Sequence, residues 1–138
     1  MSMKSWSENG FGYPVYDNNF YKMKEFLLAN ITNEELLKGL QNAKSNSDIE
    51  SALQFHDTSA SEIIADTINK NEGVDVFSFY KKDENDEPEA VGIVPVYPWT
   101  ITSAEMKTQD EYVAILNKYA EILGITEKPD YFEREYYG

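Results

Sequence analysis

The sequence has no cysteine and only one histidine, His56. Without cysteine there is no disulfide, no thiolate ligand for a metal and no thiol nucleophile. No apolar run approaches the roughly 20 residues of a membrane-spanning helix, and residues 1–6 lack the apolar core of a signal peptide. These absences predict a soluble, cytoplasmic protein, in keeping with a reducing compartment.

Basic residues are also scarce, with 12 lysines and arginines against 25 acidic residues and a net charge of −13. The second half is the more acidic, with fifteen acids and six bases in residues 72–138. Nucleic acid and anionic membranes are bound through lysine and arginine, so we expect neither as a direct partner. A basic protein would be attracted by this field, although the charge also has the simpler use of keeping the protein in solution.

At 138 residues the chain has the length of one domain. It contains no internal repeat, low-complexity block or long linker. Aromatic residues make up 14% of it, and a domain of this size needs many of them to fill its interior. We therefore predict a single globular α+β domain over residues 1–138.

Four capping boxes, in which Ser or Thr is followed three residues later by Glu, predict where helices begin. They are Thr32–Glu35, Ser47–Glu50, Ser59–Glu62 and Thr108–Glu111. Apolar residues at steps of three and four then predict the helices themselves. The first begins after Asp17 or Asn18 and ends near Asn30, and the second runs from Glu34 to about Lys44. A short helix follows Ser47, with Ile49, Leu53 and Phe55 facing inward. The last two run from Ala60 to Asn71 and from Thr108 to Leu123.

Residues 74–80 and 91–97 are rich in strand-forming side chains. Between them lies 81–89, a polar segment dominated by acidic residues. This arrangement predicts an antiparallel β-hairpin with an exposed acidic loop.

A third strand is predicted at 12–16, and the prolines suggest its place. Proline lacks a ladder donor and favours edge strands, so Pro14 and Pro95 mark the outer strands and leave 74–80 in the centre. The predicted fold is α+β, a small three-stranded antiparallel sheet with 74–80 as its central strand. About four to five helices are expected to pack on one face of this sheet.

Residues with catalytic chemistry are few. His56 is followed by Asp57, with Ser59 and Ser61 close by in the sequence. Neighbouring residues rarely share the geometry of a catalytic pair, and no nucleophile motif surrounds the serines. We therefore predict no catalytic residue, and the turn around His56 is interpreted as structural.

The acidic loop was compared with a calcium site. Asp83, Asn85 and Glu87 alternate like the start of an EF-hand loop, but Pro88 and Val94 occupy the positions that require Gly and Glu. The interpretation that remains is a solvated hairpin tip. We predict no metal site and no cofactor-binding residue.

Aromatic residues provide the candidates for partner binding. The candidates are Tyr97, Trp99, Tyr131, Phe132, Tyr136 and Tyr137. Rings near 97–99 form either a binding platform or a plug beneath the sheet. The four rings of 131–137 are too apolar to remain free, so we expect them to be sequestered on their own domain in a monomer. A homodimer interface is the alternative.

A scattered set of residues resembles that of a known group of proteins. The set comprises Trp6, Gly10-Phe-Gly12-Tyr, Ser61-Glu-Ile-Ile64, Tyr97-Pro-Trp99, Lys118-Tyr119 and Glu135-Tyr-Tyr-Gly138. It is similar to small acidic proteins of Firmicutes genomes and their mobile elements, a group with no known function. The resemblance implies a shared fold and a phage or prophage setting, and it brings no catalytic residues.

Together these observations predict a non-enzymatic acidic module that binds another protein, as an inhibitor or accessory factor. Mimicry of DNA is not favoured, because the last helix carries only Asp110, Glu111 and Glu121 and no row of acids spaced like phosphates. The alternative function is a small-ligand-binding or enzymatic domain. Its pocket would lie between sheet and helices and be lined by Tyr80, Tyr97, Trp99 and Tyr119.

Overall fold

The computed structural model describes residues 5–79, 88–94 and 108–137, and within them the fold is α+β. Five α-helices, two short 3-10 turns and four strands follow one another in these ranges. In order they are β1 (Ser5–Val15), η1 (Asp17–Asn19), η2 (Tyr21–Met23), α1 (Lys24–Ala29), α2 (Glu34–Gln41), α3 (Asn46–Phe55), α4 (Ala60–Glu72), β2 (Phe77–Phe79), β3 (Glu89–Ile93), α5 (Gln109–Leu123) and β4 (Asp130–Tyr137).

Two of the four predicted helix starts are confirmed. Thr108 forms a full capping box with Glu111, and the Ser59 hydroxyl accepts from the backbone N–H of Glu62. The other two helices begin elsewhere. Asn33 caps α2 in place of Thr32, and Ser45 caps α3 in place of Ser47. Asn and Ser are equally good caps, so a neighbouring residue of either type takes over the position.

The helix ends follow local chemistry as well. Gly73 and Gly124 adopt left-handed conformations, with φ of 66° and 74°, and close α4 and α5. The prediction that Phe55 faces inward is wrong, because its side chain is 84% exposed. Ile49 and Leu53, four residues apart, hold the buried stripe of α3. Phe55 lies two residues beyond Leu53 and so projects from the opposite side of the helix.

The sheet has four strands rather than the predicted three, in the order β2-β3-β1-β4. The predicted hairpin is confirmed, since β2 pairs antiparallel with β3. However, residues 77–79 form an edge strand, so the prediction of 74–80 as the central strand is wrong. The strand that displaces it is β1, which pairs with β3 on one side and β4 on the other.

The prediction that Pro14 marks an outer strand is wrong. Pro14 lies in an inner strand, paired with Ala90 of β3. The pairing of β1 with β4 ends at Gly12, so Pro14 needs no donor on that side. Proline is thus tolerated in an inner strand at a point where only one neighbour is present. Pro95, like most of the predicted loop 81–89, lies outside the described residues.

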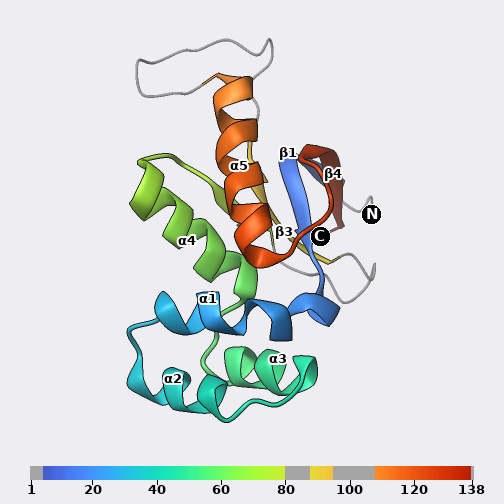
Figure 1. Cartoon of the computed structure of the whole chain (residues 1–138). Coiled ribbons are helices and arrows are strands. Elements are labelled where there is room, and N and C mark those ends of the chain that lie inside the picture. The colour runs from blue at the N-terminus through green and yellow to red at the C-terminus, as the bar shows by residue number, and fades with distance from the viewer. Residues whose placement is uncertain (1–4, 80–87, 95–107, 138) are drawn as a thin grey trace.

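One face of the sheet carries the main core. The side chains of Phe11, Tyr13, Val15, Val91 and Ile93 are buried there. Figure 1 shows α4 and α5 lying along the sheet, and they complete this core with their own apolar residues. The Tyr13 hydroxyl donates to the backbone oxygen of Leu116 in α5 over 3.0 Å. Burial, with the nearby Tyr119 as a second cause, raises the pKa of Tyr13 far above its ordinary value.

Helices α1, α2 and α3 lie beyond the end of α4 in Figure 1, rather than packing on the sheet, and their buried residues belong to the same apolar core. Polar contacts add to this packing. The Lys24 ammonium donates to the carbonyl oxygens of Gln41 and Ala43, and Asn46 bonds the backbone of Asn18 and Tyr21. In the described part of the chain, no helix combines the length and apolarity needed to cross a membrane.

Candidate functional site

The face of the sheet that points away from α4 and α5 is here called the outer face. Residues that alternate with the core side chains form it, and most are small: Gly10, Gly12, Pro14, Ala90 and Gly92. A Cβ atom at Gly12 would overlap the carbonyl oxygen of Val91, and one at Gly92 would overlap that of Phe11. The two central strands therefore approach too closely for side chains at these positions.

Two aromatic rings pack on this surface of small residues. Phe79 of β2 and Phe132 of β4 come from the two edge strands, and their ring centroids are 4.8 Å apart in an edge-to-face contact. A Cβ at Gly10 would collide with the Phe132 ring, so the glycine makes room for it. Phe79 and Ala90 are buried but lie apart from the main core. The outer face thus has a small apolar cluster of its own.

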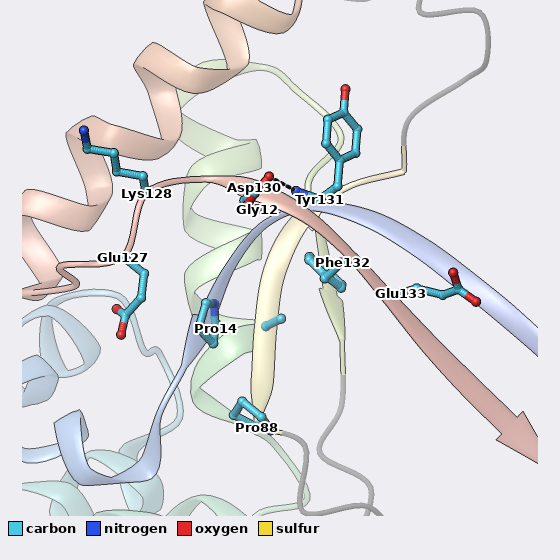
Figure 2. Close-up of a pocket in the computed structure, with 10 residues that line it drawn as sticks. Gly12, Pro14, Pro88, Glu127, Lys128, Asp130, Tyr131, Phe132 and Glu133 are labelled. Carbon is cyan, nitrogen blue, oxygen red and sulfur yellow. Dashed lines mark hydrogen bonds between the residues drawn. The ribbon is translucent and has the colours of Figure 1, made fainter.

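Beside this cluster lies a pocket of about 350 Å³. Its apolar part consists of Gly12, Pro14, Pro88, Ala90 and Phe132, and the segment from Glu127 to Glu133 borders it (Figure 2). The sheet therefore provides the floor, and the connection from α5 into β4 provides a wall. Such volumes lie at the lower end of the range for ligand sites, about 300–1,000 Å³.

The wall is charged. It contains three carboxylates, on Glu127, Asp130 and Glu133, and one ammonium group, on Lys128. Asp130 accepts from the N–H of Tyr131 over 2.8 Å, which fixes the start of β4. In Figure 2 the Lys128 side chain points away from that of Glu127. No ion pair joins them among the described residues, so the carboxylates are not neutralised within the pocket.

Glu127 stands out in this wall for the environment of one carboxylate oxygen. Its Oε2 atom is buried from solvent and has no hydrogen-bond partner among the described residues. Buried polar atoms are nearly always bonded, and leaving one without a partner costs about 1–3 kcal/mol. A donor brought by a ligand would satisfy this oxygen only when the Glu127 side chain turns it toward the pocket, since the atom has almost no exposed surface.

The predicted binding residues Tyr131 and Phe132 both border the pocket, from opposite sides of β4. Tyr131 packs against Phe11, with ring centroids 4.9 Å apart, and its hydroxyl accepts from the Gln109 amide over 3.1 Å. The Tyr131 side chain nevertheless stays 55% exposed, so the prediction of a sequestered ring is wrong there. Phe132 is half-buried and faces the pocket floor (Figure 2).

Other predicted site residues lie elsewhere. Tyr136 and Tyr137 belong to β4, where the backbone pairs with Trp6 and Ser5. This pairing places the backbone of the segment along β1 of the same chain. Tyr97 and Trp99 lie outside the described residues, as does Tyr80.

The alternative pocket, predicted between sheet and helices, is not the one observed. Its one described member, Tyr119, is buried, and its hydroxyl accepts from the Asn71 side chain over 3.2 Å. The observed pocket lies on the opposite face of the sheet. The side-chain space around Tyr119 belongs to the main core.

The residues weighed for catalysis have structural contacts. Ser59 caps α4, Ser61 is buried, and the N–H of Ser61 donates to Glu89 over 2.9 Å. No hydrogen bond joins His56 to Asp57 in the described ranges. Asp83, Asn85 and Glu87 lie outside those ranges, and within them no cluster of three or more acidic or histidine side chains is placed to hold a metal ion.

Sequence reasoning missed Glu127, Lys128, Asp130 and Glu133, which border the pocket. It also missed the bare floor, although the sequence contains a signal for it. Gly10 and Gly12, and likewise Ala90 and Gly92, are small residues spaced by two, and this period marks one face of a strand.

A comparison with protein families, curated proteins and solved structures finds no match to this chain.

Proposed function

We propose that this chain is a non-enzymatic module that binds a positively charged segment of another protein at its outer face. The observation that carries the proposal is the pocket there, where an apolar floor meets three carboxylates and a single, outward-pointing lysine. Such a site matches an amphipathic cation, with an apolar stem and a charged end. Basic side chains of proteins have this form.

The charge of the whole chain supports the same partner. A net charge of −13 creates a field that draws basic surfaces toward the protein and repels acidic ones. This long-range term raises the association rate, while the pocket supplies short-range selectivity. Because salt screens it, binding should weaken as ionic strength rises.

The lining of the pocket favours binding over catalysis. The described residues that border it include no serine, threonine or histidine to act as nucleophile or base. Its carboxylates come from a connecting segment and an edge strand rather than from facing elements that would aim two of them at one reacting atom. Recognition of a cation requires only their charge.

Selection from a random peptide library tests the proposal, with the full chain as bait. We expect enrichment of peptides rich in arginine and lysine, whose binding falls steeply between low and physiological salt. Backbone amide shifts of the labelled protein should then change around residues 88–92 and 127–133. Enrichment of neutral or acidic peptides, or of none, would overturn the proposal.

A small-ligand site is the second candidate, favoured by a volume within the range of such sites. A screen of neutral fragments by the same amide shifts separates the two functions. Fragments that bind in the pocket while no basic peptide does would favour the small ligand.

A further inference from the structure

We infer that the pocket of the outer face receives one arginine side chain of the partner, with the Glu127 carboxylate as its ion-pair acceptor. This inference rests on the proposed function and specifies the group that is recognised. It begins from the Glu127 oxygen that is buried without a hydrogen-bond partner among the residues that the structure describes. A guanidinium donates up to five hydrogen bonds in a planar fork, two of which match a carboxylate.

The floor of the pocket suits the rest of an arginine side chain. Pro14 and Phe132, both half-buried, offer apolar surface to its methylene stem. A guanidinium packs favourably over the face of an aromatic ring, and Phe132 borders the pocket. Arginine is more weakly hydrated than lysine and stacks on aromatic rings, so it loses less on entering such a site.

The charged side chains around Glu127 favour the binding of one cation. Asp130 and Glu133 place two more carboxylates along β4, while Lys128 points away from Glu127. Asp130 already accepts from the Tyr131 backbone. Glu127 is therefore the acceptor with an unmet bond, and the other two carboxylates contribute field.

Titration of the labelled full chain with three capped amino acids tests this assignment. The probes are the N-acetyl, N-methylamide forms of arginine, lysine and citrulline, the last a neutral isostere of arginine. We expect saturable amide shifts at residues 89–92, 127–128 and 130–133 with arginine, and affinities at least about tenfold weaker with the other two. Loss of one charge-assisted bond accounts for a change of that size.

Glu127→Gln should weaken arginine binding by about tenfold or more, and the exposed Glu121→Gln on α5 is the matched control with the same loss of charge. Equal binding of arginine and lysine, equal binding of citrulline, or an unaffected Glu127→Gln would each overturn the assignment. The citrulline comparison uses the unaltered protein, so it decides the matter even if the variant misfolds.

The two proposals fail in different ways. If selected basic peptides bind the Glu127→Gln variant normally and are not displaced by capped arginine, the arginine pocket is wrong and protein binding stands. If capped arginine binds in the pocket but no basic peptide is selected, the partner is a small guanidinium compound. That outcome would overturn the proposed function.

Discussion

The two faces of the sheet are built from alternate residues of the same strands and are used in opposite ways. The inner face presents Phe11, Tyr13 and Val91 to α4 and α5 and closes the main core. The outer face presents Gly12 and Gly92, which bring the strands together and leave a pocket beside them. A period of two residues thus separates the part that stabilises the fold from the part that offers a site.

This difference predicts opposite sensitivities to side-chain volume. Removing atoms from the inner side leaves a cavity, whereas adding atoms to the outer side creates a collision. The effects on the free energy of unfolding should rank accordingly, with core truncation first, glycine substitution next, and single polar groups last.

The largest effect is expected for Leu116→Ala on α5. Leu116 is fully buried against the inner face, so its truncation should lower the free energy of unfolding by about 2–5 kcal/mol. Ile122→Ala on the same helix is the control, because Ile122 is 56% exposed. Urea denaturation measures both. A loss below about 1 kcal/mol for Leu116→Ala would show that the core collapses to fill the space.

Gly12→Ala tests the outer face. The added Cβ would meet the Val91 carbonyl, a backbone atom that cannot rotate away, so we expect a loss of about 1–3 kcal/mol. Gly39→Ala in α2 is the matched control, because its Cβ would meet only the Ala52 methyl at 3.5 Å. That change should stabilise by up to about 1 kcal/mol through helix propensity. Equal effects of the two substitutions would remove the close approach as an explanation.

The helices were the most predictable part of the fold, because their ends depend on local residues. Ser59 and Thr108 were both placed correctly as helix caps. The cap of α3 was misplaced by two residues, since Ser45 and Ser47 offer the same chemistry and only the hydrogen bond from Asp48 distinguishes them. Local signals determine that a helix starts, and tertiary packing selects among equivalent caps.

The sheet order was less predictable because strand pairing is non-local. Residues 131–137 were recognised as an aromatic segment that docks on its own domain, but their pairing along residues 5–11 was not foreseen. That pairing adds the fourth strand and makes β1 an inner strand. No local sequence pattern in either segment indicates which strand it pairs with.

The candidate site likewise contains one residue that the sequence predicted and one that it did not. Phe132 was found from its composition, as one ring in an aromatic cluster. Glu127 was not, because an ordinary glutamate between α5 and β4 becomes notable only when its Oε2 atom is buried with no partner among the described residues. Burial of a single atom is a tertiary property, and one sequence does not contain it.

Tyr13→Phe probes a single polar contact of the inner face. It removes the bond to the Leu116 oxygen and should cost about 1 kcal/mol at pH 7. The raised pKa of Tyr13 also predicts that the protein loses stability as pH rises above about 10, where the unfolded tyrosine ionises and the folded one does not. The phenylalanine variant lacks this contribution. Its deficit should therefore shrink at alkaline pH in urea unfolding curves, and a constant deficit would contradict the pKa shift.

The smallest effect, and the one that distinguishes the two faces most sharply, is expected for Glu127→Gln. The substitution removes a charge whose buried oxygen has no partner in the described part of the chain, so the free energy of unfolding should stay the same or rise by less than about 1 kcal/mol. Side chains that serve binding commonly contribute nothing to the free energy of unfolding, or lower it.

The exposed Glu121→Gln, measured in the same urea titration, accounts for the general benefit of lowering the net charge. A loss of more than about 1 kcal/mol in Glu127→Gln alone would mean that the carboxylate holds the connection between α5 and β4 in place. In that case the wall of the pocket would be part of the framework. If stability is instead unchanged and arginine binding is lost, the outer face carries a group that the fold does not need.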